Sequence, residues 1–253
     1  MCGGVQKLAA ISHRVRRGRS FEGDVTVVSC IMPTRDRRAF VAQAVAQFLA
    51  QDYPDRELIV VDDGDDAVTD LLPADGRIRS IRLIRLDRRA TIGAKRNIAC
   101  EAAAGDVIVH WDDDDWMADW RLTYQVTALA EHAADVCGLA RVYFYESAAR
   151  RGWVYAYPPG GNPWVAGGTL CYRKAVWRGR PFPDVDAGED TRWLWALRNV
   201  KIVALDDSSF YVVRVHANNT RTRPIARPPF AQCPPEAVEA MIPGVGAAAW
   251  PEC

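Results

Sequence analysis

The sequence predicts an α/β fold with a mostly parallel central sheet and helices on both of its faces. Short β-branched runs alternate with segments of helical periodicity through the first half of the chain. Two of these runs end in acidic clusters, at residues 62–66 and 112–115. With 253 residues, 49% of them hydrophobic, the chain can bury one large core. Because ligands bind at the carboxyl ends of parallel strands, both acidic clusters are candidate site residues.

The composition excludes several classes of protein. Lysine plus arginine and aspartate plus glutamate both number 32, which removes the electrostatic argument for nucleic-acid binding. The seven cysteines are scattered and form no Cys-x-x-Cys pair, which argues against a zinc site or a disulfide framework and for a reducing compartment. No window is long and apolar enough to span a membrane, and the first residues lack the apolar core of a signal peptide. We therefore expect a cytoplasmic protein that does not span a membrane.

The first elements predict a βαβ unit. A β-branched run at residues 25–31 predicts a buried strand. Helical spacing follows at residues 40–49, with Thr34 or Asp36 as the expected N-cap. A second short apolar run, at residues 58–61, predicts the next strand. Strand, helix and strand at this spacing are typical of a parallel sheet with a crossover helix.

The next helix is predicted to begin with positive charge. In the strand expected at residues 81–86, apolar residues are interspersed with arginines, so we expect one face of this strand to be solvated. The helix expected at residues 94–104 carries Lys95 and Arg96 in its first turn, where positive charge opposes the helix dipole. A phosphate bound at the helix start would compensate these charges. The alternative is that both side chains are simply exposed.

The central strand, expected at residues 107–109, leads into four consecutive aspartates, Asp112 to Asp115. Their charges repel one another, and at the mouth of a buried strand between Trp111 and Trp116 this repulsion needs a cation to relieve it. Mg²⁺ or Mn²⁺ suits such a site, because these ions take one or two carboxylates plus the phosphates of a substrate. The alternative is an acidic turn that only keeps the surface soluble. A helix is expected next, at residues 119–131.

The second half is less regular. Residues 136–145 and 153–157 predict two antiparallel strands, and residues 167–172 a return strand. A helix opens with Glu189 and Asp190, whose charges complement the helix dipole, so a purely structural role for both is open. Two strands, at residues 201–205 and 210–215, finish the sheet. Repeated prolines after residue 221 predict a tail without regular structure.

The motifs and their order resemble those of family 2 glycosyltransferases, which have the GT-A fold. The resemblance covers about residues 25–220. The matching motifs, in chain order, are Pro33-Thr34-Arg35-Asp36-Arg37, Val61-Asp62-Asp63-Gly64-Asp65, Gly93-Ala94-Lys95-Arg96-Asn97, Ala104-Gly105-Asp106, Asp112-Asp113-Asp114-Asp115, Glu189-Asp190 and Arg214-Val215-His216. The resemblance implies a Rossmann-like, mostly parallel central sheet with helices on both faces and a smaller antiparallel sheet on the acceptor side.

The resemblance also implies roles for individual residues. Asp190 would be the general base. The cofactor would be Mn²⁺ or Mg²⁺, held by Asp112, Asp114 and His216. The nucleotide would be bound by Pro33, Thr34, Arg35, Asp63, Arg96, Asp112 and Asp113. The acceptor or the transferred sugar would be contacted by Trp164, Gly168, Glu189 and Trp193, although tryptophans at helical or strand spacing are more often core residues.

The reaction implied is a metal-dependent, inverting transfer of a sugar from a nucleoside-diphosphate sugar to an acceptor hydroxyl. The chemistry fits these residue types, because a cation stabilises the charge on the leaving diphosphate and a carboxylate accepts the acceptor proton. Arg35 stands in place of the usual aromatic residue, which leaves the nucleotide open, although a UDP-type donor is expected. Glu189 stands where processive enzymes have glutamine, which argues for transfer of single sugars. The acceptor could be a glycan, a lipid or a small molecule.

Three segments are expected on this basis. Residues 1–23 form a basic lead-in, either a mobile terminus or a segment that docks peripherally to an anionic membrane surface. Residues 24–220 form the glycosyltransferase domain, with a nucleotide-binding half at 24–118 and an acceptor half at 119–220. Residues 221–253 form the proline-rich tail.

Two other functions are compatible with parts of this pattern. A nucleotidyltransferase of the same fold would carry a glycine-rich loop after its first strand, and residues 33–38 contain no glycine. A catalytically silent module that binds a nucleotide sugar or a glycan would keep the binding residues but would not need Asp190.

Overall fold

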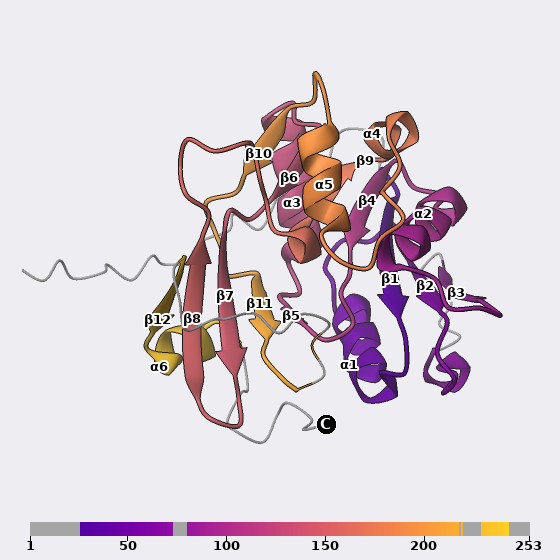
Figure 1. Ribbon diagram of the computed structural model, residues 1–253, viewed down its shortest axis with the longest axis horizontal. Helices are drawn as coiled ribbons and strands as arrows, with labels where there is room; N and C mark the ends of the chain where they lie inside the picture. Colours follow the sequence, from indigo (N-terminus) through magenta and orange to yellow (C-terminus); the bar gives the residue numbers. More distant parts are fainter. Residues whose placement is uncertain (1–25, 73–79, 218, 220–228, 243–253) are drawn as a thin grey trace, which may run out of the picture.

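The computed structural model describes residues 26–72, 80–217, 219 and 229–242. The basic lead-in at 1–23 therefore lies outside the described residues, as does most of the tail. The described chain forms two sheets, one of seven strands and one of five. In Figure 1 the large sheet extends from β10 at the top to β3 at the right, and the small sheet lies below and to the left. None of the described helices is long and apolar enough to cross a membrane.

The seven-stranded sheet has the strand order β10-β6-β9-β4-β1-β2-β3. Its central pairs are parallel, and only β9 runs antiparallel to its neighbours β4 and β6, which confirms the mostly parallel sheet. The strands are β1 (Val28–Thr34), β2 (Arg56–Asp62), β3 (Ser80–Arg85), β4 (Val107–His110), β6 (Val136–Gly138), β9 (Cys171–Arg173) and β10 (Ile202–Ala204).

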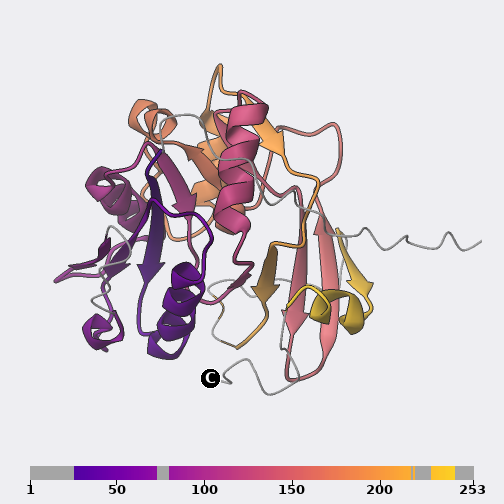
Figure 2. The ribbon, with the colours of Figure 1, turned by 180° about the vertical axis from the view of Figure 1, so that it is seen from behind.

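Helices cover both faces of this sheet, as predicted (Figure 2). Alternate residues of β1 point to opposite faces, so that Met32 packs with α1 and α3 whereas Ile31 packs with α2, α4 and α5. The helices on the first face are α1 (Arg38–Leu49) and α3 (Arg121–Glu131). Those on the second face are α2 (Ile92–Ala102), α4 (Lys174–Gly179) and α5 (Glu189–Ala196). Two short 3₁₀ turns are η1 (Thr69–Leu71) and η2 (Gly167–Thr169).

The five-stranded sheet has the order β12-β8-β7-β11-β5. Its strands are β5 (Trp116–Met117), β7 (Arg141–Glu146), β8 (Arg151–Ala156), β11 (Tyr211–Arg214) and β12 (Phe230–Cys233). Three of its four strand pairs are antiparallel, as expected for the smaller sheet, while β11 and β7 pair in parallel. Helix α6 (Pro235–Glu239) packs on one face through Val238, beside Tyr145 and Val212.

Three predicted elements need correction. The strand expected at 136–145 is two strands, because β6 joins the large sheet and β7 the small one after the chain crosses between them. The tail is not free of regular structure, since β12 pairs with β8 and Pro235 lies in the first turn of α6, where proline is tolerated. The N-cap of α1 is Arg37, without a side-chain cap, because Asp36 instead accepts a hydrogen bond from the backbone N–H of Asp65 at 2.6 Å.

Candidate functional site

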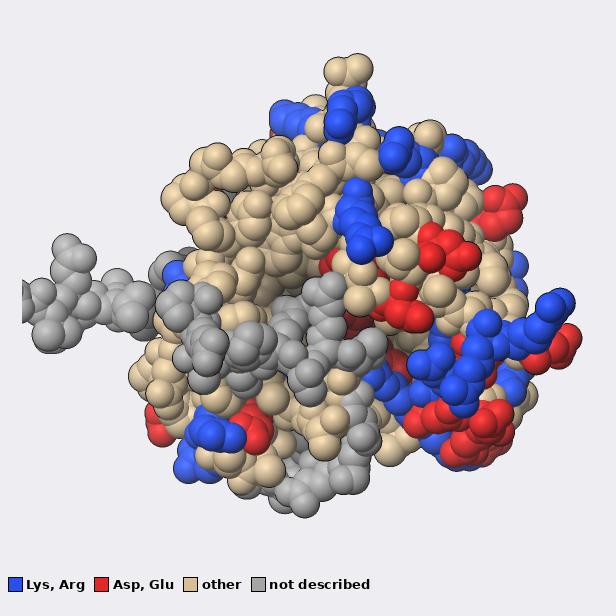
Figure 3. Space-filling view, in the orientation of Figure 1, with Lys and Arg blue, Asp and Glu red and all other residues tan. Residues whose placement is uncertain are grey.

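A cleft of about 1790 Å³ lies between the two sheets, at the carboxyl ends of β1 and β4. It is the hollow in the middle of the face shown in Figure 3. Most of the site residues predicted from the sequence line this cleft: Pro33, Thr34, Arg35, Arg96, Asp112, Asp113, Asp114, Trp164, Gly168, Glu189, Asp190 and His216. The fold therefore brings together residues that are up to 183 positions apart, from Pro33 to His216.

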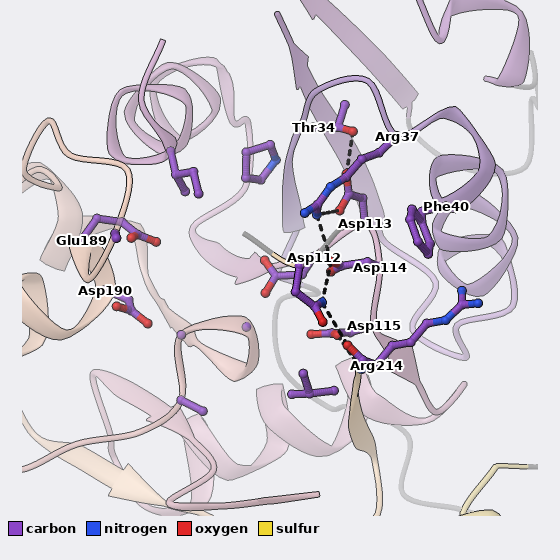
Figure 4. Close-up of a pocket in the computed structure, with 18 of the residues that line it drawn as sticks. Thr34, Arg37, Phe40, Asp112, Asp113, Asp114, Asp115, Glu189, Asp190 and Arg214 are labelled. Carbon is purple, nitrogen blue, oxygen red and sulfur yellow. Dashed lines mark hydrogen bonds and ion pairs between the residues drawn. The ribbon is translucent and has the colours of Figure 1, made fainter. Parts of the chain in front are cut away.

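Asp113 and Asp114 share one arginine. Arg37 Nη1 lies 2.9 Å from Asp113 Oδ1 and 2.9 Å from Asp114 Oδ2 (Figure 4). Asp113 also accepts a hydrogen bond from Thr34 Oγ1 at 2.6 Å, and burial together with the charge of Asp114 raises the pKa of Asp113 to about 6. Burial acts in the same direction on Asp114, but a hydrogen bond from His216 and the charge of Arg37 outweigh it and hold the pKa of Asp114 below its ordinary value.

The other two aspartates have different surroundings. Burial and the charges of Asp114 and Asp112 raise the pKa of Asp115 well above its ordinary value, and this carboxyl is held by the Tyr211 hydroxyl and by the backbone N–H of Arg214 at 3.0 Å. The side chain of Asp112 is 26% exposed and lies 3.3 Å from Arg96 Nη2. Much of the repulsion among the four aspartates is thus relieved by the protein's own groups, which the sequence argument for an external cation did not foresee.

The acidic cluster offers a cation fewer protein ligands than predicted. Asp114 Oδ2 and His216 Nε2 lie 3.1 Å apart, so these two side chains are together as expected. Among the described residues, no group of three His, Cys, Asp or Glu side chains could hold a metal ion. One carboxylate and one imidazole still fit Mg²⁺ or Mn²⁺, because these ions complete their shell with water and substrate phosphates. The protein part of such a site is Asp114 and His216, with Asp112 close by in the sequence.

The first turn of α2 is compensated by carboxylates of the protein. Lys95 Nζ lies 2.5 Å from Asp63 Oδ1 and donates to the Thr34 carbonyl at 2.9 Å. Arg96 lies 3.3 Å from both Asp112 and Glu189, and although burial lowers the pKa of an arginine, these carboxylates outweigh it and raise the pKa of Arg96. Both side chains are buried, so the alternative that they are simply exposed is wrong.

The backbone N–H groups at the start of α2, where a bound phosphate was expected, already donate to acceptors of the protein. The Gly93 N–H donates to the Val185 carbonyl at 3.1 Å, and the Ala94 N–H donates to the Thr91 hydroxyl at 3.1 Å. The Ile92 N–H donates to Asp186 at 3.3 Å. Because Thr91 and the chain after α4 bind these donors, the helix start is already capped, and the sequence prediction is wrong on this point.

Two predicted site residues do not line the cleft. The Asp63 side chain is fully buried, and its second oxygen accepts the Ala90 N–H at 2.7 Å. Trp193 is only 1% exposed, donates to the Arg180 carbonyl at 2.6 Å and packs on core rings, which corrects its assignment as a sugar contact. Its neighbour Trp195 lines the cleft instead and is 45% exposed, because α5 turns alternate tryptophans to opposite sides.

A glycine turn separates Asp190 from the aspartate cluster. A Cβ atom placed on Gly167 would lie 2.0 Å from Asp190 Oδ2, and one placed on Gly168 would lie 2.4 Å from Asp112 Oδ2. Figure 4 shows Glu189 and Asp190 on one side and the aspartates from Asp112 onward on the other. The turn η2 therefore sets the spacing between the two groups of carboxylates, because a Cβ atom at either glycine would have to displace the carboxylate that faces it.

The residues that hold this turn were missed by the sequence analysis. Arg121 is fully buried and donates from Nη2 to the carbonyls of His110 and Gly168, both at 2.9 Å. His110 Nδ1 bonds the Gly167 carbonyl at 2.8 Å, and burial lowers the pKa of His110 well below its ordinary value. No local signal marks these residues, because their partners lie up to 57 positions away. Arg37, in contrast, stands in one of the motifs quoted above, although the sequence assigned it no function.

Replacing Gly167 by alanine is expected to lower turnover by roughly 100-fold, because a misplacement of about 1 Å in a reacting group has an effect of that size. The added methyl group would lie 2.0 Å from Asp190 Oδ2 and 2.9 Å from Asp190 Cβ, so it displaces the carboxylate and shifts the first turn of α5, while the buried core is untouched. Steady-state kinetics and nucleotide titration check this. Gly179→Ala is the matched control, since its Cβ would meet nothing within 4 Å. Equal turnover in both variants would show that the turn does not position Asp190.

Solved structures identify the fold. S. aureus TarS, in its complex with UDP-GlcNAc, superposes with a TM-score of 0.61 at 20% identity, over 76% of this chain and 60% of that chain. The mannosyltransferase PcManGT from Pyrobaculum calidifontis, in complex with GDP-Man and Mn²⁺, gives a TM-score of 0.58 at 19% identity, over 78% of this chain and 58% of that chain. The protein therefore has the GT-A fold expected from the sequence.

The family follows from the sequence comparisons. The chain belongs to glycosyl transferase family 2, whose model matches residues 29–184, more than half of its length. It is 31% identical over 110 residues to a putative teichuronic acid biosynthesis glycosyltransferase TuaG of Bacillus subtilis, and 28% identical over 114 residues to an uncharacterized glycosyltransferase of Haemophilus influenzae. These matches cover 42% and 43% of this chain. They cover 43% and 44% of the relatives, so the chain spans less than half of either one.

Proposed function

We propose that this protein transfers single sugars from a nucleoside-diphosphate sugar to an acceptor hydroxyl, with inversion at the anomeric carbon and with a divalent cation. The observation that carries the proposal is the arrangement of the cleft. Asp112 and Asp114 lie on one side, Asp190 lies on the other, and η2 separates them. Two carboxylate groups on opposite sides of one cleft suit a reaction with a leaving group and an attacking group.

The donor nucleotide is assigned to the side of the cleft formed by β1 and α2. Pro33, Thr34 and Arg35 end β1 there, and Asp112 presents its partly exposed carboxylate to the ribose. Arg96 Nη1 is buried and has no hydrogen-bond partner among the described residues, so it is available to a base or phosphate oxygen. Asp63 lies behind the lining and holds Lys95, whereas Asp113 lies in the cleft wall and holds Thr34.

The cation is assigned to Asp114 and His216, with Asp112 beside them. When bound there, Mn²⁺ or Mg²⁺ stabilises the negative charge that develops on the leaving diphosphate. The protein contributes its own positive charge to the same region through Arg37, which bridges Asp113 and Asp114. The complex of PcManGT with GDP-Man and Mn²⁺ supports this assignment.

Asp190 is assigned as the general base. Its Oδ1 is engaged by the backbone N–H of Thr191 at 2.6 Å, and Oδ2 is the atom that faces η2 and the cleft. As the acceptor oxygen bonds to the anomeric carbon, the bond from that carbon to the diphosphate oxygen breaks and the acceptor proton passes to Asp190. A single displacement with one base inverts the anomeric centre. The UDP-GlcNAc complex of TarS supports a UDP-type donor.

The first test is the thermal stability of the full chain with UDP, GDP, CDP and TDP, each with and without Mn²⁺. A ligand that binds only the folded state raises the free energy of unfolding by about 2.7 kcal/mol at a hundredfold excess over its Kd. We expect one nucleotide to stabilise the protein, and to do so more strongly with Mn²⁺. The metal assignment fails if the stabilisation is equal without Mn²⁺. No stabilisation by any nucleotide would overturn the donor site itself.

A further inference from the structure

We propose that the acceptor is an uncharged glycan whose sugar ring stacks on Tyr157 and Trp164. This inference rests on the proposed transfer reaction and names the class of its second substrate. The two rings stack, with centroids 4.9 Å apart and an interplanar angle of 23°, and both line the cleft. Because each ring covers one face of the other, a pyranose can pack its C–H face against the outer face of this stacked pair.

A hydrogen bond links the aromatic platform, Tyr157 and Trp164, to the residue that follows the proposed base Asp190. Trp164 Nε1 donates a hydrogen bond to Thr191 Oγ1 at 3.1 Å, and Thr191 follows Asp190 directly in the first turn of α5. A ring stacked on Trp164 therefore lies next to the carboxylate that takes its proton. The carboxylates of Glu189 and Asp190 and the hydroxyl of Thr191 form a polar rim that can bond sugar hydroxyls. An alkyl chain of a lipid would leave that rim unpaired.

The aromatic wall continues away from the base along the small sheet. Tyr155 packs on Trp164 with centroids 5.4 Å apart, and Phe230 lies 5.1 Å from both Tyr155 and Phe144. All of these residues line the same cleft. Its volume of about 1790 Å³ exceeds the roughly 300–1,000 Å³ of a pocket for one drug-sized ligand. The cleft can therefore hold the donor and more than one acceptor ring at the same time.

The charge distribution selects an uncharged acceptor. The lysines and arginines among the described lining residues lie on the donor side or at the end of β11: Arg35, Arg37, Arg38, Lys95, Arg96 and Arg214. The described aromatic wall contributes none. Glu189 is paired with Arg96, but Asp190 forms no ion pair within the part of the chain that the structure describes, so an acceptor bearing phosphate or carboxylate would meet the negative charge of Asp190 there.

The experiment compares acceptor probes on the full chain by saturation-transfer NMR, in the presence of the nucleotide that stabilises the protein. The uncharged probes are the methyl glycosides of glucose, galactose, mannose and N-acetylglucosamine and their β-linked disaccharides. The charged probes are methyl glucuronide and glycerol phosphate, and short-chain prenol represents a lipid. We expect binding of at least one uncharged glycoside, disaccharides ahead of monosaccharides, and no binding of the charged or lipid probes. Tighter binding of a charged or lipid probe, or no binding of any glycoside, overturns the inference.

Variants test the platform itself. Trp164→Ala and Tyr157→Ala should each weaken binding of the best glycoside by roughly tenfold, the size of one aromatic contact, whereas Trp164→Phe should retain most of it. Tyr143→Ala is the matched control, because this residue lies on β7 but packs with the cluster beneath α6. Unchanged binding in both alanine variants would overturn the proposal that a sugar ring stacks on Tyr157 and Trp164. Nucleotide-dependent stabilisation, measured on the same samples, is independent of this result, so a failed acceptor site is distinguishable from a failed donor site.

Discussion

Asp190→Asn is expected to lower the turnover of sugar transfer by roughly 10³-fold, within the range that general acid–base catalysis contributes. The amide has nearly the same shape and can still accept the Thr191 N–H through its oxygen, so α5 should keep its first turn. It cannot take the proton of an acceptor hydroxyl at neutral pH. Because Asp190 lies across η2 from the donor side, the Kd for the nucleotide should stay within about twofold.

The measurement for Asp190 is product formation in the steady state, paired with titration of the nucleotide into the same variant. Asp106→Asn is a suitable control, since Asp106 is an exposed carboxylate just before β4 and does not line the cleft. Full turnover in Asp190→Asn would remove the general-base assignment. A loss of nucleotide affinity equal to the loss of turnover would instead place Asp190 in the donor site.

Asp114→Asn should weaken binding of the nucleoside diphosphate in the presence of Mn²⁺ by roughly 10- to 100-fold, the effect of losing one charge-assisted contact of about 1.5–3 kcal/mol. The amide oxygen can still accept from Arg37 and His216, so the local structure should persist. What the variant loses is the negative charge that holds the cation. Affinity in the absence of metal should therefore change little, and the difference between the two conditions should shrink.

Calorimetric titration with and without Mn²⁺ measures both affinities for this variant. Asp119→Asn provides the comparison, because its side chain is exposed near the start of α3 and does not line the cleft. If Asp114→Asn binds the nucleotide as the parent does and keeps the full response to Mn²⁺, the cation is held elsewhere. Chelation of the metal from the parent protein should reproduce the affinity of the variant.

The elements that the sequence predicted correctly have a local physical cause. β1, β2 and β4 are buried on both faces, so their residues form continuous apolar runs that are visible without any partner. α1 and α3 show their apolar face through spacing alone. β12 and α6 lacked such a pattern, since β12 is a short edge strand with exposed residues and the surrounding prolines favoured an irregular tail.

The chemical types at the site were likewise visible in the chain, because an acidic run after a buried strand and a carboxylate pair at a helix start are local features. The tertiary structure alone decided which charge meets which. Arg37 neutralises aspartates 76 and 77 positions away, Asp63 turns inward to Lys95, and α5 buries Trp193 while exposing Trp195. Electrostatic pairing and burial depend on distance in space, and the local pattern that selects a strand or a helix contains no information about that distance.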